Sequence, residues 1–124
     1  MKRHQYVRTA IDLYLEAPGT PARATRRDRA VAGDLYRRDV PIDRLAHAIR
    51  LASIRRLTAG PATIPPSVHS LAYYRAVVDR LQPDECTDDY VNYVRDKFAA
   101  ILPRIRSHRE PEGSAVSQPD SRAL

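Results

Sequence analysis

The sequence predicts an all-α protein, with a single compact domain of about five helices over 1–103 and a disordered polar tail over 104–124. Apolar residues recur at helical spacing in five separate segments, and proline-rich breaks divide these segments from one another. No segment shows the alternation of apolar and polar residues that is typical of a strand. With 124 residues, of which 43% are hydrophobic, the chain is long enough to bury one modest core.

The first two helices each have one apolar side. The first is expected over 5–16, and the proline- and glycine-containing segment 17–21 ends it. The second is expected to follow Thr25, which caps its first turn with Asp28 at the capping-box position. The apolar stripes consist of Val7, Ile11 and Tyr14 in the first helix, and of Val31, Ala32 and Leu35 in the second.

The third helix is predicted to be the central one. Pro41 suits its first turn, and its pattern continues to Leu57. A helix that is apolar on two sides is usually covered by neighbours from both directions. One side carries Ile42, Leu45, Ile49 and Ala52, and the other carries Leu51 and Ile54.

Two further helices precede the tail. The fourth is expected to begin at a cap formed by Ser67 or Ser70 and to end at Pro83. The fifth is expected to open at Thr87 and to end at Pro103. Their apolar stripes are Leu71, Tyr74, Val77, Val78 and Leu81, and then Val91, Val94, Phe98 and Ile101. The polar composition after residue 103 predicts disorder.

The charge is unevenly distributed along the chain. Residues 1–60 carry thirteen Lys and Arg against six Asp and Glu, a net charge of +7, whereas residues 61–124 have a net charge of −1. GC-rich coding would explain why most of these cations are arginine, but it would not place the excess in one half. The asymmetry indicates a polyanionic partner, and we expect nucleic acid, with DNA favoured over RNA.

Arginines of the second and third helices form a candidate phosphate-binding surface, because guanidinium groups suit bidentate phosphate contacts. On the second helix they share one stripe with Gly33, opposite the apolar side. On the third helix they share a face with His47. The predicted arginine ridge comprises Arg26, Arg29, Arg37, Arg38, Arg44 and Arg55. The alternative is a solvated face partly neutralised by Asp28, Asp34 and Asp43.

A helix-turn-helix is an alternative for the second and third helices. Leu45 and Ala48 suit the inward positions of a recognition helix. However, Asp34 and Arg38 stand where apolar residues should pack, and Asp39 stands where glycine is normal. These positions disfavour a sequence-reading helix-turn-helix.

Tyrosines next to arginines suggest a second kind of contact. Tyr73, with Arg75 nearby, is a candidate for stacking on unpaired bases, as is Tyr93, whereas Tyr74 is expected in the core. The alternative is that these tyrosines are half-buried edges of the core. The expected contacts at this helix are therefore Tyr73 and Arg75.

No catalytic centre is expected, so we predict a protein that is not an enzyme and needs no metal or cofactor. The four histidines are scattered and the four glycines are isolated. The single Cys86 excludes an intrachain disulfide and suits a reducing compartment. No signal-peptide core or membrane-spanning stretch is present, so we expect a cytoplasmic protein without a membrane partner.

The segment from Val40 to Leu81 resembles the DnaD-type helical module, and the chain also resembles small uncharacterised proteins of bacterial mobile elements. The late motif of the DnaD family is Tyr-Ile, two residues, Ile-Leu, two residues, Trp. Here Tyr73-Tyr74, Val77-Val78 and Leu81 occupy those positions, with Leu81 in place of Trp. The resemblance covers about 45 residues. It implies a role in replication initiation, with DNA and a helicase-loading protein as partners.

The sequence therefore favours a non-catalytic nucleic-acid-binding accessory protein of replication or of a mobile-element system. A larger replication or recombination protein is a further expected partner. The alternative is a helical protein-interaction subunit that does not contact nucleic acid. Its contact surface would be the Leu51 and Ile54 side of the third helix, or the tyrosines.

Overall fold

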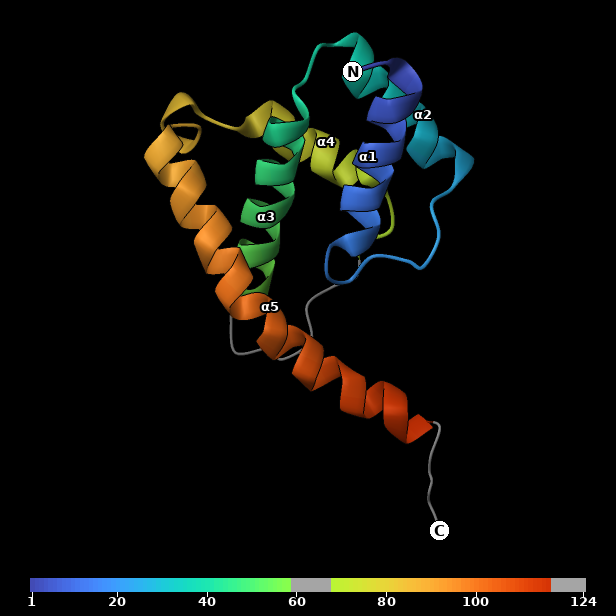
Figure 1. Cartoon of the computed structure of the whole chain (residues 1–124), viewed down its shortest axis with the longest axis vertical. Helices are drawn as coiled ribbons and strands as arrows, with labels where there is room; N and C mark the ends of the chain where they lie inside the picture. The colour runs from blue at the N-terminus through green and yellow to red at the C-terminus, as the bar shows by residue number, and fades with distance from the viewer. Residues whose placement is uncertain (59–67, 117–124) are drawn as a thin grey trace.

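Over the residues that the structure describes, the chain folds into five α-helices and one short 3₁₀ helix, which confirms the predicted all-α fold (Figure 1). A computed structural model describes the backbone of residues 1–58 and 68–116, and the side chains of residues 1–58 and 68–103. No strand occurs among these residues. The elements are α1 (Arg3–Glu16), α2 (Arg26–Arg37), α3 (Ile42–Thr58), α4 (Leu71–Arg80), the 3₁₀ helix η1 (Pro83–Glu85) and α5 (Asp88–Val116).

Helix α3 is the central helix, as predicted. It packs against α1 and α4 and, on its other side, against α5, so that it lies between α1 and α5 in Figure 1. Leu45 and Ile49 face the main core shared with α1, α2 and α4. Leu51 and Ile54 instead meet Val94 of α5 in a second, smaller core. The two apolar sides of α3 thus enter two different cores.

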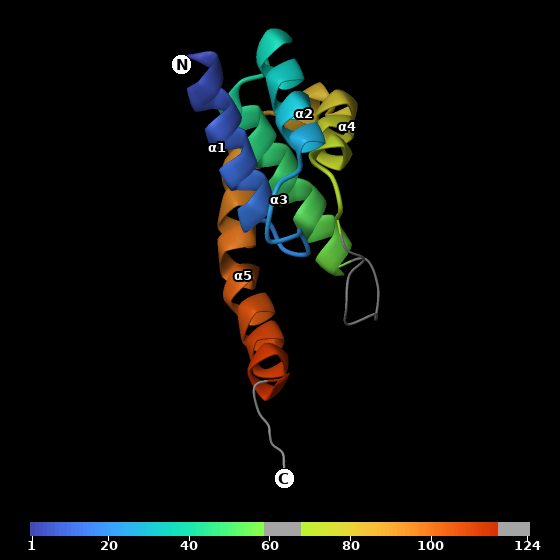
Figure 2. The ribbon, with the colours of Figure 1, turned by 90° about the vertical axis from the view of Figure 1, so that its right-hand side faces the viewer.

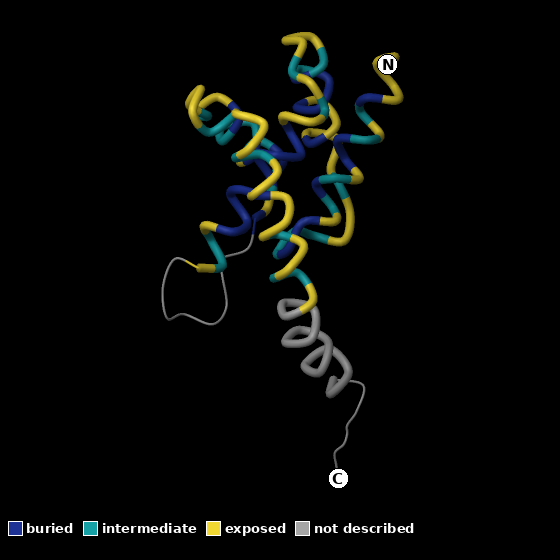
Figure 3. Tube along the Cα trace, turned by 60° about the vertical axis from the view of Figure 1, so that its left-hand side comes forward, coloured by how far each residue is buried: buried dark blue, intermediate teal, exposed yellow. Residues whose placement is uncertain are grey.

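The other helices enclose the main core from several directions. Figure 2 shows α2 and α4 side by side, and these two helices pack against each other. Figure 3 shows the buried parts of the helices facing inward and the exposed parts facing outward. The largest side chains removed completely from solvent are Tyr14, Tyr74, Leu35, Leu45 and Leu71. Their burial supplies the hydrophobic free energy that holds helices of this length together.

Helix α5 does not end at Pro103, where the sequence predicted its end. It continues to Val116. Proline inside a helix removes one backbone hydrogen bond, which makes an end favourable but does not impose one. The tail predicted for 104–124 lies outside the residues whose side chains the structure describes.

The starts of α2 and α4 are capped by one shared carboxylate. Thr25 and Asp28 form the predicted capping box, in which the Asp28 backbone N–H donates to Thr25 Oγ1 at 3.1 Å and the Thr25 N–H donates to Asp28 Oδ2 at 2.9 Å. The other oxygen of Asp28 accepts the backbone N–H of Leu71 at 3.0 Å. Of the two predicted caps for α4, Ser70 is the one that caps it. Asp28 is 1% exposed and joins two helices that are distant in sequence.

The turn between α2 and α3 has the geometry that glycine usually provides. Asp39 has φ 57°, in the left-handed region. The Val40 N–H donates to the Leu35 carbonyl and the Asp39 N–H to the Tyr36 carbonyl, which is a Schellman motif. Within the described residues α2 packs mainly on α1 and α4, and α3 on α1, α4 and α5. This packing is unlike a helix-turn-helix, in which the two helices pack against each other.

Candidate nucleic-acid interface

The outward face of α2 carries the first group of predicted site residues. Arg26 and Arg29 are exposed, and the structure gives neither an ion pair within its described part. Gly33 lies on the same stripe but is buried, and an ideal Cβ placed there would stand 2.5 Å from Nη2 of Arg3. Arg3 of α1 therefore lies across Gly33 and adds a cation to this face. Arg3 was not among the predicted site residues, because only the packing of α1 on α2 brings it there.

The first turn of α2 holds arginines where helix stability disfavours them. Arg26, Arg27 and Arg29 stand at the N-terminal end of α2, which carries the positive end of the helix dipole. Asp28, the one acidic residue of that turn, is buried in its capping contacts and does not neutralise the outer face. Asp28 therefore makes no contact with the exposed arginines at this end of α2.

The second half of the predicted α2 surface is organised by Asp34. Arg37 pairs with Asp34 at 3.2 Å and Arg75 of α4 pairs with it at 3.3 Å. Arg38 pairs with Asp79 of α4 and, at 3.7 Å, with Asp34. The hydrogen bond to Asp79 raises the pKa of Arg38, which keeps its guanidinium charged. Arg38 and Arg75 thus help to hold α2 against α4, whereas Arg37 pairs within α2, and a phosphate would have to compete with carboxylates for all three.

The third helix does not extend this surface as one continuous ridge. Arg44 is exposed near its start, but Arg55 lies three turns further along. His47 and Arg55 share a face, as predicted, yet His47 is only 2% exposed and its Nε2–H donates to the Glu85 carbonyl at 2.7 Å. On the α3 face that His47 shares with Arg55, η1 and Tyr90 of α5 cover the histidine.

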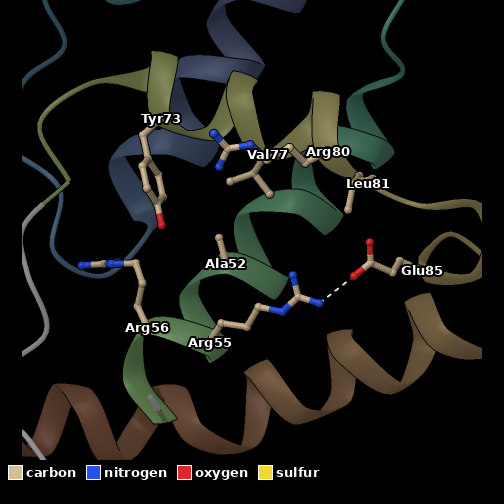
Figure 4. A pocket seen from close by; sticks show the side chains of 8 residues that line it. All are labelled: Ala52, Arg55, Arg56, Tyr73, Val77, Arg80, Leu81 and Glu85. Atoms are coloured by element: carbon tan, nitrogen blue, oxygen red, sulfur yellow. Dashed lines mark hydrogen bonds and ion pairs between the residues drawn. The ribbon is translucent and has the colours of Figure 1, made fainter. Parts of the chain in front are cut away.

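Arg55 instead enters a pocket between α3 and α4, which we call the α3–α4 pocket (Figure 4). Its volume is about 320 Å³. Tyr73 of α4 and Arg56 of α3 approach each other from opposite walls, and Arg55 extends toward Glu85. The lining consists of Ala52, Arg55 and Arg56 from α3, Tyr73, Val77 and Arg80 from α4, and Leu81 and Glu85 beyond α4.

Three arginines and one glutamate give this pocket a positive balance. Glu85 Oε1 accepts the backbone N–H of Gln82 at 2.8 Å, and Oε2 accepts an N–H of Arg55 at 2.6 Å. These two bonds hold the pKa of Glu85 below its ordinary value. Arg56 donates to the Pro18 carbonyl at 3.3 Å, whereas Arg80 is exposed and has no ion pair in the described part of the chain.

The sequence analysis found Arg55 and Tyr73 but not their neighbours Arg56, Arg80 and Glu85. Tyr73, Val77 and Leu81 follow one another at intervals of four residues, which brings them to one side of α4. Which cations that face would meet depends on the packing of α3 on α4, which no local pattern encodes. Tyr73 and Arg75 were predicted to form one contact site, but the structure separates them. Tyr73 lines the α3–α4 pocket, whereas Arg75 pairs with Asp34 outside it.

The predicted exposure of the tyrosines is confirmed. Tyr74 is fully buried, whereas Tyr73 is 43% and Tyr93 is 55% exposed. Tyr93 lies on α5, where Lys97 stands 5.7 Å from its ring centroid. By contrast, Leu51 and Ile54 are buried against Val94. The apolar side of α3 that the alternative function needed as a contact surface is therefore occupied by α5.

Within the described residues, no group of three or more His, Cys, Asp and Glu side chains lies together as a metal site would require. Cys86 is a free, half-buried thiol. No helix in the same part of the chain is long and apolar enough to cross a membrane.

Comparison with known proteins adds no relative to this picture. No family model matches the chain, and no significant match was found among curated proteins or among solved structures.

Proposed function

We propose that this chain is a nucleic-acid-binding protein that holds phosphates on the outer face of α2 and catalyses no reaction on them. The observation that carries the proposal is the pair Arg26 and Arg29, exposed and without carboxylate partners in the described structure, with Arg3 lying over Gly33 about one turn along α2 from Arg29. Uncompensated guanidinium groups on one face attract a polyanion and release its counterions. Contacts of this kind give affinity with little dependence on base sequence.

The position of these arginines supports the proposal further. A helix N-terminus offers unpaired backbone N–H groups and a positive dipole, which favour anions and disfavour cations. Arg26, Arg27 and Arg29 therefore cost α2 stability where they stand. A bound phosphate would offset that cost.

The proposed biological setting rests on the resemblance to DnaD-type modules and mobile-element proteins. DNA engaged in replication or in movement of such an element would be the target, and a larger protein of that machinery would be the second partner. Arg37, Arg38, Arg44, Arg55, Tyr73 and Arg75 stay proposed contacts in this scheme.

The test is salt-dependent binding of labelled single-stranded DNA, double-stranded DNA and RNA to the wild type and to Arg26→Ala/Arg29→Ala. Each lost phosphate contact should reduce the slope of log affinity against log salt by about 0.7 for single strands and about 0.9 for duplex DNA. The double variant should therefore bind more weakly, with a slope reduced by roughly 1.4 or 1.8. The matched control, Arg95→Ala/Lys97→Ala, removes the same charge from the exposed surface of α5 and should change the slope little.

Two results would contradict the proposal. One is the absence of binding by the wild type at low salt, and the other is an equal slope in the α2 and α5 variants. Co-purification of an acidic protein that survives nuclease treatment, together with no nucleic-acid binding, would establish the interaction-subunit alternative instead.

A further inference from the structure

The α3–α4 pocket combines cations with an exposed aromatic ring, apart from the outer face of α2. We propose that this pocket binds the phosphate monoester of a nucleotide, with the phosphate between Arg55 and Arg80 and the base against Tyr73. If the monoester is the 5′-phosphate of a nucleic-acid strand, the inference extends the proposed function and rests on it. If it is a free nucleoside monophosphate, the inference does not depend on that function.

The phosphate side of the pocket is already arranged to hold an oxyanion. Arg55 donates to a carboxylate oxygen of Glu85 at 2.6 Å, so its guanidinium is positioned for charge-assisted hydrogen bonding. Arg80, on the opposite wall, is exposed and has no ion-pair partner in the described residues. Arg56 adds positive charge at the edge while it donates to the Pro18 carbonyl.

The Glu85 carboxylate determines which kind of phosphate group binds best in the α3–α4 pocket. An anion that binds Arg55 competes for its guanidinium with the Glu85 carboxylate, which carries one negative charge. A phosphodiester also carries one charge, whereas a monoester carries roughly −1.5 to −2 near neutral pH and offers three acceptor oxygens. The monoester therefore competes better for Arg55 and can contact Arg80 at the same time. This comparison favours a terminal phosphate over an internal one.

The remaining wall of the pocket fits a planar base. Tyr73 is 43% exposed, and its ring packs at 79° against buried Tyr74 with the centroids 5.1 Å apart, which limits its movement. Val77, one turn further along α4, and Leu81, the C-cap residue of α4, continue the same wall. Aromatic faces of this kind stack on nucleobases. The volume of about 320 Å³ is at the small end of ligand pockets, roughly 300–1,000 Å³, which suits one nucleotide.

The experiment compares matched ligands on the full-length protein. Calorimetry measures thymidine 5′-monophosphate against thymidine and inorganic phosphate. Fluorescence anisotropy measures a 3′-labelled single-stranded oligonucleotide with a 5′-phosphate against the same strand with a 5′-hydroxyl. The monoester should bind at least about tenfold more tightly than its partner without phosphate, the effect of one charge-assisted hydrogen bond. If the protein prefers thymidine 5′-monophosphate over thymidine but does not distinguish the two oligonucleotides, the ligand is a free nucleotide. If it prefers the oligonucleotide with the 5′-phosphate, the ligand is a strand end.

Three exposed or half-buried positions test the assignment of roles. Arg80→Gln should remove most of the preference for the monoester, whereas Arg95→Gln, which removes the same charge from α5, should leave it unchanged. Glu85→Gln should strengthen monoester binding, because it removes the competing carboxylate from Arg55. Tyr73→Leu should weaken binding of the nucleotide but not of inorganic phosphate.

Equal affinity for phosphorylated and unphosphorylated ligands in both pairs would overturn the inference. So would equal effects of Arg80→Gln and Arg95→Gln, or a loss of affinity in Glu85→Gln with its fold intact by circular dichroism. If oligonucleotides bind with the α2-dependent salt slope but ignore the 5′-phosphate, and the free nucleotide does not bind, the inference fails and the proposed function stands. If only the free nucleotide binds, the proposed function fails and the inference stands.

Discussion

Burial in the core changes the acid–base behaviour of the Tyr14 side chain. It is fully buried in α1, and its ring packs edge-on against Tyr74 with the centroids 6.2 Å apart. Burial, helped by the negative charge of Asp28, raises the pKa of its phenol to about 12. Its hydroxyl has no hydrogen-bond partner among the described residues. The folded state therefore holds Tyr14 neutral more strongly than the unfolded chain does.

This difference predicts a loss of stability at alkaline pH. The unfolded chain releases the Tyr14 proton near the ordinary pKa of 10, whereas the folded chain keeps it to about 12. The free energy of unfolding should therefore be at its full value below pH 10 and fall as the pH rises toward 12. Tyr14→Phe should flatten this fall and cost less than about 1 kcal/mol at neutral pH, since the lost hydroxyl is unpaired. Urea unfolding across the alkaline range measures both effects.

The control for this measurement is Tyr93→Phe, which changes an exposed tyrosine on α5. It should leave the alkaline slope as in the wild type. If Tyr14→Phe and the wild type lose stability equally above pH 10, the buried phenol does not contribute to the slope.

At the end of α2 the backbone adopts a conformation that the amino-acid residue at that position does not favour. The Schellman motif needs a left-handed residue, and Asp39 provides it with φ 57°. Glycine adopts this conformation without steric cost, whereas other residues resist it. The absence of glycine at this position disfavoured such a turn, yet the backbone forms the turn with aspartate.

Asp39→Gly should therefore stabilise the protein by about 0.5–1 kcal/mol, by relieving the backbone at the end of α2. Asp43→Gly is the matched control, because it removes the same charge in the first turn of α3, where the backbone is helical. Glycine inside a helix should cost about 0.5–1 kcal/mol there. Thermal unfolding followed by circular dichroism should show opposite shifts in Tm, and shifts of the same sign would contradict the assignment.

At the scale of the whole molecule, Asp28 links the start of α2 to the start of α4. Thr25→Ala should cost about 1 kcal/mol, because it removes one helix cap. Asp28→Ala removes its part of the same capping box and also leaves the buried Leu71 N–H without an acceptor. It should cost about 1–3 kcal/mol more than Thr25→Ala. Urea unfolding of both variants checks the difference, and equal losses would show that the bond to Leu71 contributes nothing.

The sequence by itself determined the elements and their inward faces. Helical periodicity placed five helices, the capping box at Thr25 and Asp28 marked the start of α2, and the two apolar sides of α3 predicted its central position. These features depend on neighbours within a few residues, so a local pattern contains them. The end of α5 was missed at Pro103, because proline disfavours helix continuation without preventing it.

Only the tertiary structure decided which charged side chains meet. It buried His47 beneath η1, paired Arg38 with Asp79, and drew Arg55 and Tyr73 into one pocket with Arg80 and Glu85. Ion pairs and pockets join residues far apart in the chain, and their partners depend on how helices pack rather than on helix periodicity. The structure thus divides the predicted arginine ridge between two surfaces, which are the outer face of α2 and the α3–α4 pocket. The packing of α4 on α2 and α3 separates them.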